Sequence, residues 1–361
     1  MLRNSSLPLY HKNGEKSITT PGGLWYDRSM VRYLAQMFLK RDGKILLGLK
    51  KRGFGKGKLV SPGGKVDPGE TVMQAAIREC EEESGVKVHS CTEVALVVFR
   101  DLYYKGEPET DIMYAFVSED FEGEPVETDE LVPEWHPIDE LPFERMWKDA
   151  QYWMPDAMRG RKVDSYFRYN EKDELVEHEV DIVPDQCIIR LRDKDFGLPE
   201  DGDESGFVTR TASRAVLIDK DYRVALVDAT SRGYYKLPGG GIDEGELISE
   251  ALHREVREEA GYTIEPLAAL GYVHETRHKF EQFNISYAFL ARAKEFVGTN
   301  LMEDEIEDGF ELKWFDNIDE AIKAVEAVDT SDMVYQAKFF TARELAILRA
   351  ARKVLKEQYG Q

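Results

Sequence analysis

The chain has 361 residues, of which 42% are hydrophobic and 11% aromatic, so it is long enough for two domains that each bury a core. Acidic residues number 69 and basic residues 48, which gives a formal net charge of −21. This charge excludes an ordinary surface for duplex DNA, because the sequence contains no basic patch to offset it. A phosphorylated ligand remains compatible with such a protein when divalent cations screen the charge.

Nothing in the sequence predicts membrane attachment or a disulfide framework. No apolar run approaches the roughly 18–20 residues that a membrane span needs. Residues 1–30 are polar, contain prolines and glycines, and lack the apolar segment of a signal peptide. The three cysteines, Cys80, Cys91 and Cys187, follow no CxxC spacing. We therefore expect a cytoplasmic protein with free thiols and no membrane partner.

The first predicted domain follows an N-terminal arm, residues 1–30, and extends over residues 31–190. Alternating apolar residues predict a hairpin at its start, and a helix is predicted from Thr71 to Ser84. Thr71 and Gln74 fit a capping box, and Gly85 fits a C-terminal cap. The other predicted elements are strands at 32–39, 44–49, 93–102, 112–117, 165–169 and 175–182, and a helical stretch at 143–158.

A linker is predicted at residues 191–206, because the stretch DFGLPEDGDESG is acidic and nearly free of apolar residues. After it, the order of predicted elements begins again over residues 207–361, with strands at 212–218 and 223–227 before a glycine-rich loop and a helix. Gly64 and Gly240 begin equivalent segments, a register of 176 residues. The sequence therefore predicts a duplicated domain.

The last predicted element is an amphipathic helix at residues 341–358. Leu345, Leu348, Ala351 and Leu355 keep helical spacing along one face. We expect this face to pack on its own domain. The alternative is an oligomer contact formed through domain 2.

One spaced pattern occurs in each half of the chain. It consists of a glycine, five residues, a glutamate, seven residues, and then the letters RExxEExG. Its members are Gly64, Glu70, Arg78, Glu79, Glu82, Glu83 and Gly85 in the first half, and Gly240, Glu246, Arg254, Glu255, Glu258, Glu259 and Gly261 in the second. A single acidic helix face is usually only solvated. Seven fixed positions, however, have a chance probability on the order of 10⁻⁸ per window, and the pattern occurs twice, which indicates a function.

The spacing of the pattern predicts a metal site on each helix. Positions i, i+3 and i+4 share a helix face, so the three last glutamates of each pattern form one carboxylate stripe. A hard divalent cation, Mg²⁺ or Mn²⁺, would reverse the repulsion among them. The preceding glycine, Gly63 or Gly239, can add a backbone carbonyl oxygen to the cation's ligands. We interpret the pairs Arg78 with Glu70, and Arg254 with Glu246, as structural.

These residues are those of the Nudix box, and both halves resemble Nudix hydrolases over most of their length. The resemblance implies two α/β/α sandwich domains, each with a mixed sheet. It implies two or three Mg²⁺ or Mn²⁺ ions and attack of water on a phosphorus atom of a nucleoside diphosphate-linked substrate. By the same resemblance, the catalytic residues are Glu82 and Glu83 in domain 1 and Glu258 and Glu259 in domain 2. The expected partners are nucleotide substrates.

Domain 1 resembles the oxidised purine nucleoside triphosphatases in the stretches LLGLKKRGFGKGK, PGGKVDPGET, GEPVETDELVPEW and LPFERMWKDAQYWMP. The resemblance implies hydrolysis of a purine triphosphate such as 8-oxo-dGTP to the monophosphate and pyrophosphate. The roles that it implies are an additional acid near the metals for Glu130, phosphate contact for Lys50, base contact for Phe54 and Trp147, and reading of the purine edge for Asp149. The sequence departs from the family at Ala150, where a second aspartate is usual, and at Val60, where an asparagine is usual.

Domain 2 resembles a generic bacterial Nudix hydrolase in RAVLIDKDYRVALV and YYKLPGGGIDEGE. Glu305 or Glu307 could supply an extra acid, and Arg277, His278 and Lys279 could approach phosphates or form a solvated turn. Three hypotheses stand together: a bifunctional enzyme with two active sites, a domain 2 that hydrolyses ADP-ribose or a dinucleotide or mainly stabilises the assembly, and a ligand-sensing module. The absence of any DNA-binding element and the intact glutamates argue against the third.

Overall fold

The computed structural model describes residues 17–19, 25–27, 31–104, 107–172, 174–200, 202–229, 233–243, 245–301, 303–307, 309–329 and 335–360. The chain divides into two compact units, Met1–Val183 and Pro184–Gln361, here called domain 1 and domain 2. The predicted N-terminal arm falls largely outside the described residues. The parts of it that are described form two short strands, β1 (Ser17–Thr19) and β2 (Trp25–Asp27), which pair antiparallel.

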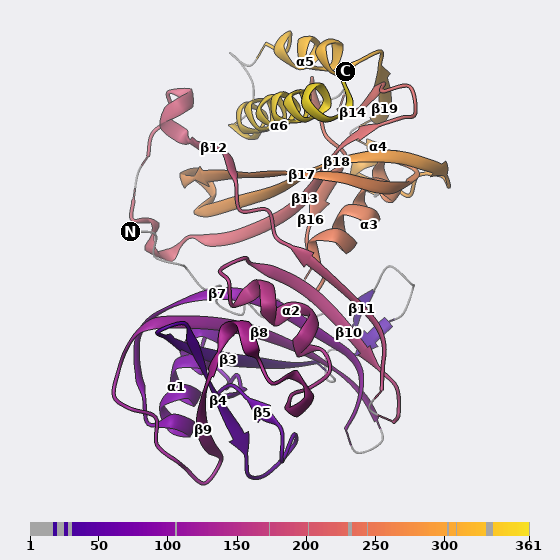
Figure 1. Cartoon of the computed structure of the whole chain (residues 1–361). Coiled ribbons are helices and arrows are strands. Elements are labelled where there is room, and N and C mark those ends of the chain that lie inside the picture. The colour runs from indigo at the N-terminus through magenta and orange to yellow at the C-terminus, as the bar shows by residue number, and fades with distance from the viewer. Residues whose placement is uncertain are drawn as a thin grey trace. The chain divides into compact units, whose positions relative to one another are not determined.

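Domain 1 is built on a mixed sheet with strand order β11-β10-β7-β8-β3-β4-β5, in which β6 also pairs with β3 and β9 with β4 (Figure 1). The pairs β3–β8 and β7–β10 are parallel and the others antiparallel. Its strands are β3 (Val31–Arg41), β4 (Lys44–Lys50), β5 (Leu59–Val60), β6 (Gly63–Lys65), β7 (Lys87–Tyr104), β8 (Glu107–Glu122), β9 (Leu131–Pro137), β10 (Val163–Tyr169) and β11 (Leu175–Ile182).

Two helices cover opposite faces of this sheet, α1 (Val72–Ser84) and α2 (Ala150–Ala157). Alternation along β3 explains the layering, since neighbouring side chains of a strand point to opposite faces. Met37 and Leu39 pack with α1, whereas Phe38 packs with Trp153 of α2. Domain 1 is therefore the α/β/α sandwich that the sequence predicts.

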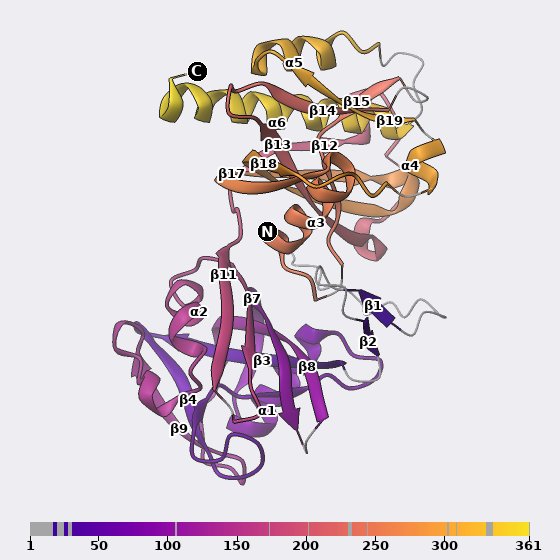
Figure 2. The same cartoon turned by 90° about the vertical axis from the view of Figure 1, so that its right-hand side faces the viewer.

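Domain 2 repeats this architecture with strand order β12-β17-β18-β13-β14-β15, in which β16 also pairs with β13 and β19 with β14 (Figure 2). Its strands are β12 (Cys187–Arg192), β13 (Val208–Ile218), β14 (Val224–Ala229), β15 (Tyr234–Lys236), β16 (Gly239–Gly241), β17 (Tyr262–Arg277), β18 (Gln282–Phe296) and β19 (Phe310–Phe315). Helix α3 (Ile248–Ala260) covers one face, α5 (Ile318–Glu326) and α6 (Tyr335–Tyr359) pack on the other, and α4 (Glu303–Glu307) precedes β19.

The described elements confirm the hairpin and the capped first helix but change three predictions. The domains separate after Val183, earlier than the predicted linker at 191–206, because β12 pairs with β17 and belongs to the second sheet. The predicted helical stretch at 143–158 is one 3-10 turn, Phe143–Arg145, followed by α2, since Met146 between them is extended. The predicted strands at 93–102 and 112–117 are longer, as β7 and β8.

The final helix packs on its own domain, as predicted. Leu348, Ala351 and Leu355 of α6 are buried in one core cluster with strand residues of the second sheet. The three cysteines carry free thiols. Among the described residues, no helix is long and apolar enough to cross a membrane.

Candidate active sites

Helix α1 begins and ends where local hydrogen bonds dictate. The Thr71 hydroxyl accepts from the Gln74 backbone N–H, and the Gln74 side chain accepts from the Thr71 N–H, which completes the capping box. Gly85 ends the helix in the left-handed conformation, with φ of 72°. The apolar face of helix α1 is buried. The adjoining face, which carries the three glutamates, is therefore fixed toward the glycine turn that precedes the helix.

Arg78 ties this helix to the turn in front of it. Its guanidinium donates to both carboxylate oxygens of Glu70, at 2.7 and 3.2 Å, and to Glu79 at 2.8 Å. It also donates to Glu82 at 3.3 Å and to the Lys65 carbonyl at 3.1 Å. The arginine holds the pKa of Glu70 below its usual range, mainly through the hydrogen bond. The interpretation of this pair as structural agrees with its geometry.

Domain 2 repeats the network with Arg254. Its guanidinium donates to Glu246 at 2.7 Å from two nitrogens, to Glu255 at 2.7 Å and to Glu258 at 3.3 Å. It also donates to the Gly241 carbonyl at 2.9 Å. Helix α3 again ends in a left-handed glycine, Gly261. The two helices thus present the same carboxylates in the same arrangement.

The last glutamate of each pattern is buried beneath the glycine turn. Glu83 accepts from the Gly63 N–H at 2.9 Å, and Glu259 accepts from the Gly239 N–H at the same distance. Burial raises the pKa of both carboxyl groups, that of Glu259 to about 7. Burial also raises the pKa of Glu258.

A lysine neutralises this buried glutamate in each domain, but from a different strand. In domain 1, Lys50 at the end of β4 lies 3.5 Å from Glu83 and 3.9 Å from Glu130. In domain 2, Lys236 of β15 donates to Glu259 at 2.5 Å. The buried glutamate of each helix therefore has a lysine partner, which comes from different positions in the two halves of the sequence.

The glycine turns leave room for a cation beside the carboxylates. A Cβ atom at Gly64 would lie 2.4 Å from the Glu79 carboxylate, and one at Gly240 the same distance from Glu255. Glycine is therefore required where these carboxylates meet the backbone. The donors are all hard oxygens, the type that Mg²⁺ and Mn²⁺ prefer. In the part of the chain that the structure describes, no three acidic, histidine or cysteine side chains already surround one point, and Arg78 and Arg254 each hold two of the helix carboxylates by hydrogen bonds.

The predicted additional acid, Glu130, lies at the mouth of the first site. It accepts from Arg52 at 2.5 and 2.9 Å, which lowers the pKa of Glu130. Lys50 lies near both Glu130 and Glu83, so the two carboxylates share one cationic neighbour. Arg52 is a site residue that the sequence reading missed.

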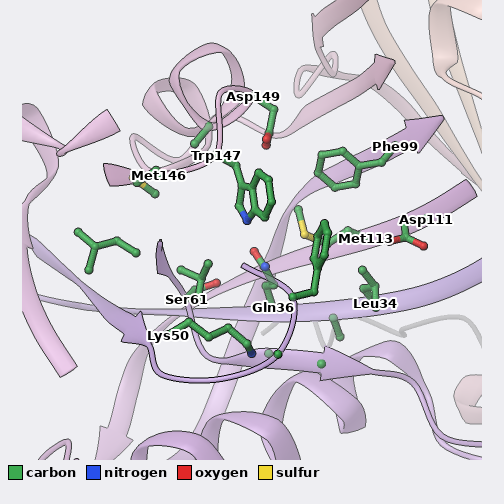
Figure 3. Close-up of a pocket in the computed structure, with 18 of the residues that line it drawn as sticks. Leu34, Gln36, Lys50, Ser61, Phe99, Asp111, Met113, Met146, Trp147 and Asp149 are labelled. Atoms are coloured by element: carbon green, nitrogen blue, oxygen red, sulfur yellow. The ribbon is translucent and has the colours of Figure 1, made fainter. Parts of the chain in front are cut away.

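A cavity of about 480 Å³ adjoins the first carboxylate site. Phe54 and Trp147 both line it and stack on each other, with ring centroids 5.0 Å apart and planes 17° from parallel. Trp147 and Asp149 lie across the cavity from Lys50 (Figure 3). The structure therefore brings together all four residues assigned to the substrate of domain 1 by resemblance.

Asp149 is buried at one end of this cavity, with 4% of its surface exposed. The Trp153 indole N–H donates to one carboxylate oxygen at 3.0 Å, and the Tyr169 hydroxyl donates to the other at 2.9 Å. Burial raises the pKa of Asp149, and the two hydrogen bonds oppose that rise. The group is thus held in position by two neighbours that the sequence reading did not assign to the site.

Several further residues line the cavity and were missed. They are Arg32, Leu34, Gln36, Phe99, Asp111, Met113, Met146, Trp153 and Tyr169. The members from β3, β7 and β8 share one sheet face, so alternation along these strands was the available signal. Arg32 donates to both oxygens of Asp111, at 2.6 and 2.8 Å.

The residues of domain 2 that were considered for phosphate contact or as an extra acid have different surroundings in the structure. Arg277 is buried and donates to Glu275 at 2.5 Å, and His278 lies 3.2 Å from Asp193. Both therefore have structural partners. Glu307 is exposed on α4, and the side chain of Glu305 lies outside the described residues.

Known proteins match both halves of the chain. The NUDIX domain model matches residues 32–157 and 208–336. The oxidized purine nucleoside triphosphate hydrolase of Danio rerio is 40% identical over 154 residues, which cover 43% of this chain and 97% of that relative. The uncharacterized Nudix hydrolase YvcI of Bacillus subtilis is 29% identical over 147 residues, 40% of this chain and 90% of the relative. A solved MutT protein from Bacillus halodurans aligns with a TM-score of 0.38 and 23% identity, covering 42% of this chain and 97% of that chain.

Proposed function

The chain belongs to the NUDIX family and is a Nudix hydrolase, and we propose that both of its domains hydrolyse nucleoside diphosphate-linked substrates with Mg²⁺ or Mn²⁺. The observation that supports this most directly is the repeated network around Arg78 and Arg254. Two helices far apart in sequence hold the same three glutamates against a glycine turn at matching distances. The three glutamates repel one another in each of the two helices. A cation that relieves this repulsion therefore has a function in both domains.

In each domain the candidate cation ligands are the three glutamates of the helix and the carbonyl of the preceding glycine. They are Glu79, Glu82, Glu83 and Gly63 in domain 1, and Glu255, Glu258, Glu259 and Gly239 in domain 2. Bound divalent cations supply charge neutralisation of the diphosphate and a water nucleophile of lowered pKa. The exposed Glu82 would face the bound cations and could accept a proton there, and the buried Glu83 is held by Lys50 and Gly63.

For domain 1 we propose a purine nucleoside triphosphate as substrate, with the monophosphate and pyrophosphate as products. The support is the cavity that runs from Lys50 to Asp149 and carries the stacked pair Phe54 and Trp147. Trp147 can bury a purine ring whatever its substituents. Ala150 cannot supply the second carboxyl group that the related enzymes use, so the preference for an oxidised base such as 8-oxo-dGTP is reduced.

For domain 2 we propose a different nucleoside diphosphate derivative, such as ADP-ribose or a dinucleotide. The support is the change in the residues that surround its helix, where Lys236 occupies the strand position of Val60 in domain 1. This conclusion follows from strand pairing, because Val60 lies opposite Gly48 on β4 and Lys236 lies opposite Val227 on β14. A charged group therefore replaces an apolar wall.

The test is to inactivate the two helices separately in the full chain. Glu82→Gln removes a charged ligand while keeping its size, and we expect it to lower hydrolysis of dGTP about 10³-fold or more. Glu258→Gln should leave that activity unchanged and remove the activity toward any substrate of domain 2. A panel of nucleotides with Mg²⁺ or Mn²⁺, with products identified by chromatography, gives the readout. Wild-type rates in the double variant on every nucleotide that the wild type hydrolyses would contradict the proposal.

A further inference from the structure

The carbonyl of Gly239, a proposed cation ligand of domain 2, already accepts a hydrogen bond from a guanidinium group. Arg214 of β13 donates to this oxygen at 3.0 Å and to the Ser286 hydroxyl at 3.3 Å. The arginine is buried, with 9% of its surface exposed. Among the described residues it makes no ion pair with a carboxylate, although buried charges are normally paired.

Domain 1 has no charge at the equivalent position. Gly63 of β6 lies opposite Gln36 of β3, and Gly239 of β16 lies opposite Arg214 of β13. Gln36 and Arg214 are therefore counterparts, and both are fixed by the same antiparallel pairing. The two domains differ by one full positive charge beside the same backbone carbonyl.

This charge remains on Arg214 at neutral pH. Burial, followed by repulsion from the buried Arg343, lowers the pKa of Arg214 to about 10, while attraction by Glu344, Glu259 and Glu275 opposes this fall. A guanidinium with that pKa is still protonated under ordinary conditions. Its approach to Gly239 is also close, since a Cβ at that glycine would lie 3.0 Å from the Arg214 Cγ.

A divalent cation must come within about 2.0–2.6 Å of a carbonyl oxygen to be bound by it. With the Arg214 nitrogen 3.0 Å from the same oxygen, the two positive groups would repel each other at short range and in a buried setting. The repulsion is stronger than in water because the arginine is removed from solvent. In domain 1 the residue opposite Gly63 is the uncharged Gln36, and among the described residues no guanidinium donates to the Gly63 carbonyl.

Resting on the proposed function of the two helices as cation sites, we infer that Arg214 takes the place of one divalent cation at the Gly239 carbonyl. Domain 2 then binds one cation fewer than domain 1 and keeps only those held by its glutamates. The guanidinium also supplies a fixed positive charge where the diphosphate of the substrate meets the glycine turn. The two domains therefore differ in their metal requirement as well as in their substrate.

The experiment exchanges the two residues in the full chain and counts bound Mn²⁺. Free Mn²⁺ is measured by electron paramagnetic resonance during titration, without substrate. Arg214→Gln introduces the residue of domain 1, and we expect it to bind one more Mn²⁺ per chain. Gln36→Arg should bind one fewer. Arg349→Gln, an exposed substitution in domain 2, should bind the same number as the wild type.

Additional variants separate this inference from the proposed function. Glu82→Gln and Glu258→Gln should each weaken Mn²⁺ binding, and Arg214→Lys, which keeps the charge, should not gain a cation. If the two glutamate variants behave as expected but the number of bound cations is unchanged in both exchange variants, the inference about Arg214 is overturned and the proposed function stands. If the wild-type chain binds no Mn²⁺, both are overturned. Thermal unfolding shows whether each variant folds. If Arg214→Gln does not fold, the number of cations bound by Gln36→Arg decides the inference.

Discussion

The sheet face opposite α1 in domain 1 carries Gln36, Phe99 and Met113, whereas the corresponding positions in domain 2 carry Arg214, Glu275 and Ser286. The correspondence follows from the strand registers, in which Phe99 is opposite Asp111 and Glu275 is opposite Asn284. Met113 is opposite Leu34, and Ser286 is opposite Ala212. An apolar cavity in one domain has become a cluster of charged and polar groups in the other.

The loops near the two sites also differ, both in length and in the aromatic residues that they carry. Residues 51–58 connect β4 to β5 and carry Phe54, whereas only residues 230–233 connect β14 to β15. In domain 2, the single tryptophan, Trp314, packs with the core on the α3 side of the sheet. The glutamate-bearing helix and its arginine are thus repeated in both halves of the chain, while the groups that could contact a base are not. The two halves therefore share the glutamate-bearing helix and differ in the residues that surround it.

The first prediction concerns the arginine networks, where the expected effect on stability is largest. Arg254 and its partner Glu246 are more enclosed than Arg78 and Glu70, with side-chain exposures of 17% and 8% against 29% and 18%. Removing one partner of an enclosed ion pair leaves an uncompensated charge. We expect Arg254→Met to cost about 3 kcal/mol of unfolding free energy in domain 2, and Arg78→Met about half of that in domain 1.

Hydrogen-exchange mass spectrometry in urea measures the two domains separately in one chain. The exposed Arg349→Met should cost well under 1 kcal/mol, because surface ion pairs contribute little. Equal losses for Arg78→Met and Arg254→Met would show that the difference in enclosure does not matter for stability.

The second prediction tests whether base stacking belongs to domain 1 alone. Trp147→Ala removes the aromatic wall of the cavity while leaving Lys50 and the glutamates in place. We expect KM for dGTP and for 8-oxo-dGTP to rise by about tenfold alike, since stacking and ring burial do not depend on the substituents. Trp147→Phe should restore most of the loss. A change confined to one of the two nucleotides would mean that Trp147 reads the base edge instead.

The sequence was sufficient for the glutamate-bearing helix α1 because the contacts that join it to the glycine turn are local. Glu70, Arg78 and Glu83 lie within twenty residues of Gly63, and helical spacing alone places them on one side. The cavity was harder to predict, since its lining extends from Arg32 to Tyr169 and depends on how β3, β7 and β8 register. Resemblance supplied Trp147 and Asp149, but it could not supply Arg52 or the support of Asp149 by Trp153 and Tyr169.

The domain boundary shows a different limit of sequence reasoning. β12 occupies the place in the second sheet that β10 occupies in the first, parallel to its neighbour in both cases. In domain 1 this strand, β10, comes late in the sequence of its domain. In domain 2 the equivalent strand, β12, comes before all the other strands of its sheet. A short strand next to an acidic segment carries no local signal of the sheet it joins, so the predicted linker at 191–206 fell too late.

The smallest expected effect concerns the protonation of Asp149 in the cavity of domain 1. Burial raises the pKa of Asp149, so the neutral form persists to higher pH than in an exposed aspartate. The neutral carboxyl can donate a hydrogen bond to the O6 atom of a 6-oxopurine, whereas the ionised form only accepts, as from a 6-amino group. As pH rises through this raised pKa, the ratio of kcat/KM for dGTP over dATP should therefore fall, by about fivefold for one hydrogen bond of roughly 1 kcal/mol. The same sign applies to stability, because a folded-state pKa above the unfolded value gives a contribution that is present at low pH and lost as pH rises. Asp149→Asn keeps both a donor and an acceptor without titrating, so its ratio should not change with pH. A wild-type ratio that is equally flat between acidic and alkaline pH would exclude Asp149 as the group that reads the purine edge.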